Sequence, residues 1–362
     1  IRNYTYPSHD KSAKHRLANY ASFALSASLV SAHRLPRLDV LWVYNSPISV
    51  ALPMWTIQLF QRIPAVTHVM DLWPDSIEAA GFQLPRFPNA LTKAAAAWNS
   101  AMLSSARRVC FISPGAGSEM ARRGVPGEKL VYCPLWADED SFFPSDDDGG
   151  LRSRLGIGST EIVFMYAGAL GAAQDVVGIA RAFLATDLPN SCHLVILGAG
   201  TQESKLRDLA RRHPTRIHFL DRMPSSEIHH AMAASDIQLA GFADPNIARL
   251  SMPSKVQSSL ASGKGLLSTG PGDLSDLIRS HQVGFASDTS EDADIRKAFH
   301  EAAAAGRSGL RKIGRRARSL YLRDFAVATS VARVERVLYE AAGSRCGSRD
   351  RTRDLPNFPG RE

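Results

Sequence analysis

The stretch IVFMYAGALG, residues 162–171, decides the fold, because it predicts a buried strand that runs into a glycine-rich turn. We expect a helix over residues 175–186 after this turn, and the same alternation then repeats. Further strands are predicted at 193–197, 216–220, 236–240 and 265–269, with helices at 202–212, 225–234, after Pro253 and at 273–280. Strand–helix alternation of this kind predicts a doubly wound parallel sheet.

The first part of the chain carries the same alternation. Strands are predicted at 39–44, 65–70, 107–112 and 130–132, and the clearest helices at 14–33 and 89–105. A polar, glycine-terminated run at 145–150 predicts a linker. We therefore expect two Rossmann-like domains, residues 1–144 and 151–306. An arginine-rich helical region, residues 307–342, is expected to pack back on the first domain, and the tail, residues 343–362, to be disordered because it lacks an apolar period.

Length and composition are typical of a two-domain globular protein. The chain has 362 residues and a formal net charge of +8, from 43 basic and 35 acidic side chains. That charge is compatible with a phosphorylated substrate, an anionic membrane surface or nucleic acid. The sequence holds none of the known nucleic-acid modules, so no nucleic-acid partner is expected. The basic side chains between residues 311 and 318 are interpreted as a solvated helix face.

Cysteines and acidic residues give no sign of a metal centre. Cys110, Cys133 and Cys192 lie in apolar, strand-like runs and are expected to be buried, reduced thiols, whereas Cys346 lies in the tail. Three Asp-x-Asp spacings, at 138–140, 146–148 and 292–294, arise readily by chance in so acidic a set of residues. We expect neither a metal nor a cofactor. No apolar run approaches about 18 residues, so no membrane-spanning helix is predicted.

Four loops of the second domain are expected to meet at the carboxyl ends of its strands, where open parallel sheets bind ligands. They are residues 168–171, 198–200, 221–224 and the region before Pro253. Glycines after strands let backbone N–H groups approach a phosphate closely. The last loop leads into a helix start at Ser254 and Lys255, where a serine cap, free N–H groups and a lysine would favour an anion.

Two common nucleotide motifs are missing. No GxxxxGK[ST] sequence occurs, which argues against a P-loop ATPase, and no GxGxxG follows the first strand of either half, which argues against an NAD enzyme. Among the histidines, His68 precedes the loop at Asp71 and is the one acid–base candidate that we retain.

These motifs, in this order, resemble the donor-binding domain of family 4 glycosyltransferases with the GT-B fold, in which two Rossmann-like domains face a cleft. The resemblance covers most of residues 16–340. It rests on YAGALG (166–171), ILGAG (196–200), ASDI (234–237), PSKV (253–256) and LASGK (260–264). In the first domain, DLWPDS (71–76) and PLWAD (134–138) are similar to the branch that builds O-antigen, capsule and colanic-acid-like polysaccharides, including N-acetyl-fucosaminyl transferases.

The resemblance implies a retaining transfer of a sugar from a nucleoside diphosphate sugar, UDP rather than GDP, without a metal or cofactor. It implies a lipid-linked or saccharide acceptor in cell-surface polysaccharide synthesis. The expected location is the cytoplasm, with peripheral contact to anionic lipid on the inner face of the plasma membrane. Residues 1–144 would then be the acceptor side and residues 151–306 the donor side.

The resemblance also assigns roles to residues. Asp71 and Lys255 are the expected catalytic residues, Asp71 orienting the acceptor and Lys255 stabilising the departing diphosphate. The diphosphate site is expected to use Gly168, Leu170, Gly171, Gln174, Ser254 and Lys255. The nucleoside site is expected to use Gly198, Gly200, Arg222, Met223 and Ser258.

Several positions depart from the family pattern. Ser258 stands where many members carry a glutamate that hydrogen-bonds the ribose, and Leu250 replaces the first glutamate of that pair. The basic pair that grips the diphosphate in relatives falls on Ala169 and Gln174. Met70 and Leu135 replace an arginine and an asparagine of this branch. The alternative reading is therefore a degenerate, non-catalytic protein that retains a nucleotide-sugar pocket.

The N-terminal region departs as well. The first domain of this fold begins with a strand, a glycine-rich loop and a helix, and nothing before Asp39 supplies them. We expect an incomplete first domain, from an N-terminally truncated chain, in which a sheet edge is left unpaired.

Overall fold

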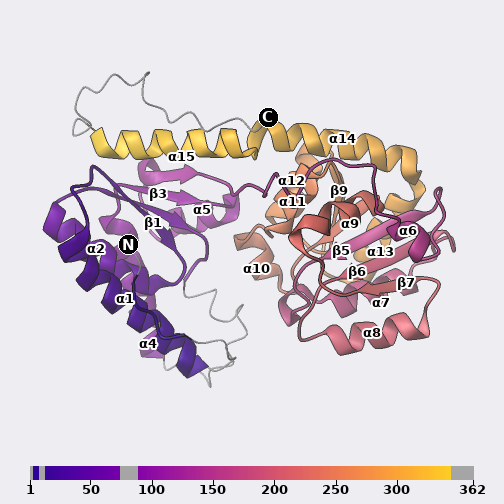
Figure 1. Ribbon diagram of the computed structural model, residues 1–362, viewed down its shortest axis with the longest axis horizontal. Coiled ribbons are helices and arrows are strands. Elements are labelled where there is room, and N and C mark those ends of the chain that lie inside the picture. Colours follow the sequence, from indigo (N-terminus) through magenta and orange to yellow (C-terminus); the bar gives the residue numbers. More distant parts are fainter. Residues whose placement is uncertain (1–2, 8–12, 74–88, 344–362) are drawn as a thin grey trace.

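The computed structural model describes residues 3–7, 13–73 and 89–343, which form two α/β domains along one long axis (Figure 1). The described part of the first domain holds a parallel sheet in the order β1-β2-β3-β4. Its strands are β1 (Leu41–Asn45), β2 (Ala65–Val69), β3 (Arg108–Phe111) and β4 (Leu130–Tyr132). Its helices are α1 (Ala13–Arg34), α2 (Ala51–Gln61), α4 (Asn89–Ser105) and α5 (Pro114–Arg122). The expected strand–helix alternation of the first domain is thus confirmed.

Strand β1 lies at an edge of this first sheet. It pairs in parallel with β2 on one side, and the described residues supply no strand on its other side. Its outward side chains, Trp42 and Tyr44, are 43% and 57% exposed. Every open sheet has two edge strands, so the predicted incompleteness of the first domain stays a prediction.

The second domain holds a six-stranded sheet in the order β10-β9-β8-β5-β6-β7, and its paired strands are all parallel. The strands are β5 (Ile162–Ala167), β6 (Cys192–Leu197), β7 (Ile217–Leu220), β8 (Ile237–Ala240), β9 (Gly265–Ser268) and β10 (Gly284–Ala286). The helices are α6 (Leu151–Arg154), α7 (Val176–Ala185), α8 (Glu203–Arg212), α9 (Ile228–Ala234), α10 (Pro245–Leu250), α11 (Lys255–Ala261), α12 (Asp273–His281) and α13 (Asp292–Ala304).

The strand order of the second sheet reverses between β5 and β8. The chain proceeds outward from β5 through β6 to β7, then returns to the other side of β5 and proceeds through β8 to β10. In doubly wound sheets the crevice beyond such a switch point is the usual ligand site. The glycine turn after β5 therefore lies where the fold by itself predicts binding.

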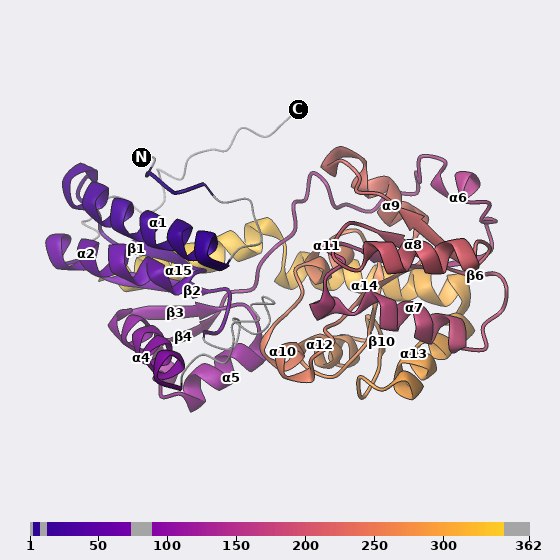
Figure 2. The same cartoon turned by 90° about the horizontal axis from the view of Figure 1, so that it is seen from below.

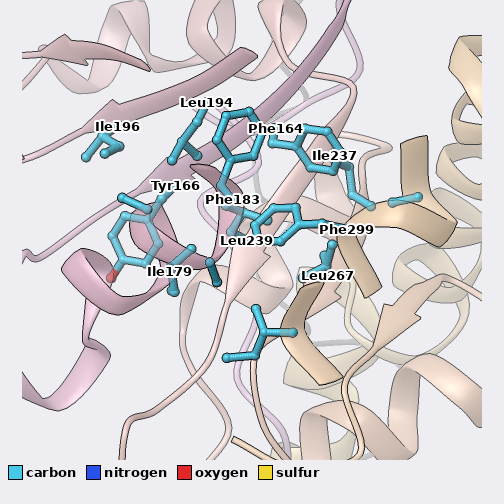
Figure 3. Packing of buried hydrophobic residues seen from close by; sticks show 14 of the residues in the cluster. Phe164, Tyr166, Ile179, Phe183, Leu194, Ile196, Ile237, Leu239, Leu267 and Phe299 are labelled. Atoms are coloured by element: carbon cyan, nitrogen blue, oxygen red, sulfur yellow. The ribbon is translucent and has the colours of Figure 1, made fainter. Parts of the chain in front are cut away.

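The second core is built around three aromatic side chains. Phe164 of β5, Phe183 of α7 and Phe299 of α13 meet edge to face, with ring centroids 5.2–5.8 Å apart (Figure 3). All three side chains are fully buried. Edge-to-face packing adds to the burial of these large side chains, so this cluster holds one face of β5 against both helices. Tyr166, at the end of the same strand, belongs to the same cluster.

Two C-terminal helices connect the domains. Helix α14 (Gly306–Asp324) packs on α11 and β9, while Val337 and Ala341 of α15 (Val327–Ala342) pack against Val66 and Cys110 of the first sheet. In Figures 1 and 2 the two helices together extend alongside both domains. The division into 1–144, 151–306 and 307–342 stays a prediction, and the tail beyond Gly343 lies outside the described residues.

The structure adds elements that sequence periodicity missed. Helices α10 and α13 and strand β10 were not predicted. Helix α10 and strand β10 are short, whereas α13 buries Phe299 with Ala298 and Ala302 at a helical spacing that could have been recognised. Cys110, Cys133 and Cys192 are buried and free, as expected, and Cys346 lies outside the described residues. No helix in the described part of the chain combines the length and apolarity that crossing a bilayer requires.

Candidate functional site

The centre of the candidate site is the ammonium group of Lys255, the first residue of α11. Its Nζ is buried and makes no hydrogen bond to any residue that the structure describes, although Lys255 as a whole is partly exposed. Nζ lies 3.3 Å from the centroid of the Tyr166 ring, a cation–π contact with the end of β5. Burial lowers the pKa of Lys255 to about 7. A buried amine without an acceptor is a group that an anion would satisfy.

The glycine turns after β5 and β6 lie against each other and against Lys255. A Cβ at Gly168 would come within 3.2 Å of the lysine Nζ, and a Cβ at Gly198 would overlap the carbonyl oxygen of Gly168. Both residues have positive φ angles, +145° and +148°, which disfavour other residues. Glycine is therefore required here both for the backbone conformation and for the close approach of the two turns.

Backbone hydrogen bonds fix the two turns to one another. The N–H of Gly168 donates to Leu197 O at 2.9 Å, and the N–H of Leu170 donates to Ala199 O at 3.0 Å. The Leu170 side chain is fully buried in the second core. Leu170 therefore holds the turn in place, and its N–H is already occupied instead of being free for a diphosphate.

Tyr166 is a site residue that sequence reasoning did not single out. Its ring lies beneath the Lys255 ammonium group, and its hydroxyl donates to Ala169 O at 2.8 Å, which holds the turn at Gly168. Figure 3 shows the ring at one side of the aromatic cluster, near Ile179. The available signal was a tyrosine at the strand end directly before the glycine turn.

The start of α11 differs from its prediction in one respect. Ser254 is exposed and has helical backbone angles, φ −59° and ψ −24°, and its side chain makes no capping hydrogen bond. An N-cap serine needs an extended backbone to reach the N–H groups of the first turn. The expected serine cap is therefore wrong, and the Ser254 hydroxyl remains exposed beside Lys255.

The remaining diphosphate candidates lie in the turn between β5 and α7. Gly171 precedes a short 3-10 turn, and a Cβ there would come within 2.9 Å of Gln174 Oε1. Asp175 follows with φ +41° and accepts a hydrogen bond from the N–H of Gly178, so it caps α7. Gly171 and Gln174 thus share the loop of Gly168, but no basic side chain accompanies them at positions 169 and 174.

The nucleoside candidates lie on two loops and on helix α11 of the same domain. Gly200 and Arg222 are exposed, and Met223 packs against the cluster that contains Val195 and Leu197. Ser258 is partly buried one turn after Lys255 on α11. Gly198 joins this group to the turn at Gly168. These positions follow β6 and β7 or lie on α11, and their contact with a nucleoside stays a prediction.

On the first domain, Asp71 follows the carboxyl end of β2. Its Oδ2 accepts a hydrogen bond from Ser46 Oγ at 2.8 Å, which orients the carboxylate from the end of β1. The motif residues 74–76 lie outside the described residues. His68 is buried within β2; its Nε2 lies 2.9 Å from Cys133 O and its ring stacks on Trp42. Burial lowers the pKa of His68, so the neutral ring is a structural group of the sheet.

The described ranges contain no cluster of three or more His, Cys, Asp or Glu side chains that could hold a metal ion. His193 and His218 lie 3.2 Å apart through Nδ1 and Nε2, and His193 Nε2 lies 3.2 Å from Glu161 Oε2. Glu161 directly precedes β5, so this group belongs to the amino edge of the sheet, away from the glycine turns.

Comparisons with known proteins agree with this geometry. Residues 6–136, less than half of the chain, match the family model of the glycosyl transferase 4-like domain. No curated protein matches the chain by sequence. Among solved structures, HepE from Anabaena in complex with UDP is 15% identical, with a TM-score of 0.69 over 89% of this chain and 83% of that one.

Two further structures extend the likeness. Sucrose-phosphate synthase from Thermosynechococcus elongatus is 13% identical, with a TM-score of 0.72 over 93% of this chain and 82% of that one. WaaG, a glycosyltransferase involved in lipopolysaccharide biosynthesis, is 15% identical, with a TM-score of 0.61 over 92% and 84%. The chain therefore has the GT-B fold, and its first domain carries the sequence pattern of a glycosyl transferase 4-like domain.

Proposed function

We propose that this protein is a glycosyltransferase that uses a nucleoside diphosphate sugar. The observation that carries the proposal is the buried, unpartnered Nζ of Lys255 at the carboxyl edge of the second sheet, beside the turn at Gly168. A diphosphate would supply the acceptors that this amine lacks. The match of residues 6–136 to a glycosyl transferase 4-like domain supports the same conclusion.

The chemistry follows from the position of this charge. In sugar transfer the bond between the anomeric carbon and the diphosphate oxygen breaks, and a bond to the acceptor oxygen forms. Negative charge then develops on the departing diphosphate, and a fixed cation in a site that excludes water stabilises it. Lys255 would supply that cation. Gly168, Gly171, Gln174 and Ser254 would surround the phosphates.

The finer assignments are also part of the proposal. We favour UDP over GDP, because HepE was solved with UDP and with UDP-glucose. Retention of the anomeric configuration is proposed from the family resemblance. Asp71, held by Ser46, would orient the acceptor hydroxyl from the first domain. A role in cell-surface polysaccharide synthesis is supported by the similarity to WaaG.

A lipid-linked acceptor would bring the protein to a membrane surface. The exposed basic side chains of α14, Arg311, Lys312 and Arg315 among them, would then face anionic lipid at the cytoplasmic side. Flotation with vesicles of phosphatidylcholine and phosphatidylserine at two salt concentrations tests this contact. We expect binding that weakens with salt; absent or salt-insensitive binding would contradict it.

The donor proposal is tested by saturation-transfer NMR with UDP-glucose and with GDP-mannose. We expect saturation to reach the uridine, ribose and glucose protons of the first ligand, and weaker transfer to the second. The Lys255→Met variant is the matched control, since it removes the ammonium group while keeping a side chain of similar length. Folded wild-type protein that contacts neither ligand would overturn the proposal.

The second candidate is a protein that binds a nucleotide sugar without turning it over. The observations in its favour are Ser258 and Ala169 at positions where relatives carry a glutamate and a basic residue. If the missing ribose contact limits the site, Ser258→Glu should tighten UDP-glucose binding about 10- to 150-fold, as expected for one hydrogen bond to a charged group. Ser153→Glu, at an exposed position of α6 outside the candidate site, is the control. Sugar transfer by the unmodified chain would exclude this candidate.

A further inference from the structure

The two domains touch directly at the start of α5. Ser113, at the end of β3, donates from Oγ to Leu250 O at 3.1 Å, and the N–H of Gly115 donates to Asp273 Oδ2 at 2.8 Å. Leu250 also packs against the apolar cluster of the first domain that contains Ala116 and Met120. The contact therefore combines hydrogen bonds with buried apolar surface from both domains.

The contact leaves no space for a larger residue. A Cβ at Gly115 would overlap the carbonyl oxygen of Arg249 and come within 3.1 Å of Asp273 Oδ1. Gly115 does not have a positive φ, so glycine is needed here for the space and not for the backbone conformation. On the other side, a Cβ at Gly272 would overlap Ala248 O. The backbones of α5, α10 and the start of α12 therefore meet at the closest approach that glycine allows.

The electrostatics of the contact centre on Asp273. Its carboxylate belongs to the first turn of α12 and accepts from the first turn of α5, so it lies at the positive ends of two helices. Burial raises the pKa of Asp273, whereas hydrogen bonds from Gly115 and Ser113 act in the opposite direction. One carboxylate thus joins a helix of each domain.

This contact is linked by a short segment to the candidate cation. Helix α10 ends at Leu250, and the carbonyl oxygen of Leu250 accepts the hydrogen bond from Ser113. Helix α11 begins at Lys255, five positions later. We propose that Ser113, Gly115 and Asp273 form an interdomain clamp that positions segment 249–255 and sets the opening between the two domains. The clamp rests on its own contacts and does not require the proposed function, but in a glycosyltransferase it would hold the donor cation at a fixed distance from the acceptor domain.

The experiment measures interdomain distance by intramolecular energy transfer. Labels are attached to Leu59→Cys on α2 and Arg211→Cys on α8, which are highly exposed, in a Cys346→Ser background; Cys110, Cys133 and Cys192 are buried. We expect one narrow transfer-efficiency peak for the labelled parent. Gly115→Ala should shift and broaden this peak, and Asp273→Ala should broaden it.

Two control variants match the clamp variants. Gly127→Ala adds the same methyl group in the same domain where nothing lies within 4 Å, and Asp276→Ala removes an exposed carboxylate from the same turn of α12. Both should leave the peak unchanged. Circular dichroism melts show whether each variant is folded; if Gly115→Ala does not fold, Asp273→Ala decides the outcome.

Unchanged peaks in folded Gly115→Ala and Asp273→Ala would overturn the clamp. UDP-glucose binding is measured on the same samples by calorimetry. If the parent binds UDP-glucose but the peaks of both folded clamp variants match the parent's peak, the clamp alone is rejected. If the clamp variants change the peak but the parent protein binds no UDP-glucose, the clamp is supported and the donor proposal alone is rejected.

Discussion

The two buried lysines of the second domain lie nine residues apart and have opposite environments. Lys255, at the carboxyl edge of the sheet, finds no hydrogen-bond acceptor for its Nζ within the described part of the chain. Lys264, at the amino edge directly before β9, donates from Nζ to Ser235 O at 2.8 Å and to Ala233 O at 3.3 Å. Burial lowers the pKa of both, to about 7 for Lys255 and about 8 for Lys264. The two ammonium groups are thus similarly buried, but Lys264 has two backbone acceptors and Lys255 has none among the described residues.

The amino edge is a network of paired charges. Asp236, whose side chain is 4% exposed, accepts from Arg307 Nε at 2.7 Å and from Arg152 Nη1 at 3.3 Å. It also accepts from the N–H of Val163 at 2.9 Å, so it joins β5 to helices α6 and α14. Buried charges of this kind are normally compensated within the protein.

The difference indicates which edge holds the protein together and which edge binds. At the amino edge the partners of the buried charges are other parts of the chain. At the carboxyl edge the described residues supply no hydrogen-bond acceptor for the Lys255 amine, and the proposed partner is a diphosphate from solution. Substitutions at the amino edge should therefore lower stability, whereas substitutions at the carboxyl edge should impair donor binding.

The largest effect is expected for Asp236→Ala. Removing this carboxylate leaves Arg152 and Arg307 without their shared partner, and breaking a buried ion pair costs about 3 to 5 kcal/mol. Chemical denaturation should show that loss in the free energy of unfolding. Asp208→Ala is the matched control, since Asp208 also pairs with two arginines but is exposed, and should lose under about 1 kcal/mol. Equal losses in both variants would contradict the network.

Lys255→Met should separate binding from stability. Loss of a single fixed charge at a departing group typically lowers the rate about 10²- to 10³-fold, and we expect that loss in sugar transfer from UDP-glucose. Stability should move in the other direction. Because the folded pKa lies below the unfolded one, the buried charge is a cost below about pH 7 that fades as pH rises toward the unfolded pKa. Thermal melts at pH 6 should therefore show a higher melting temperature for the variant.

Lys264→Met is the control for that comparison. It leaves the carbonyl groups of Ala233 and Ser235 without their donor, so we expect a loss of about 1 to 3 kcal/mol in the free energy of unfolding. UDP-glucose binding by the folded fraction should be unchanged. If both lysine variants lost stability and kept binding, the distinction between the two edges would be wrong.

The smallest effect is a pH dependence of donor binding. The free amine of Lys255 has a pKa of about 7, and a bound diphosphate would raise it. The affinity for UDP-glucose, whose diphosphate carries no proton that titrates near pH 7, should be constant below about pH 7. Above it the affinity should fall up to about tenfold per pH unit. Calorimetry from pH 6 to 9 measures this profile, and Lys255→Met should show a flat one.

Much of the fold follows from local patterns. Apolar strands such as Ile162–Tyr166, which alternate with helices along the chain, predicted both parallel sheets. Continuous apolar runs of this kind are buried on both faces of such sheets. Two elements escaped prediction for different reasons: α10 has only six residues, whereas α13 buries Phe299 together with two alanines at a helical spacing that could have been recognised. The serine cap at Ser254 was predicted from residue type, yet the backbone there is helical, and a sequence does not show that angle.

The site divides in the same way. The sequence by itself identified Gly168, Gly198 and Lys255, because glycine turns after strands and a lysine at a helix start have known physical uses. Only the tertiary structure placed the Tyr166 ring under Lys255, left its Nζ without an acceptor, and used the Leu170 N–H within the turn. It alone brought Gly115 to Asp273 across 158 positions of the chain. Local chemistry is encoded in neighbouring residues, whereas burial and partnership depend on which distant segments the fold brings together.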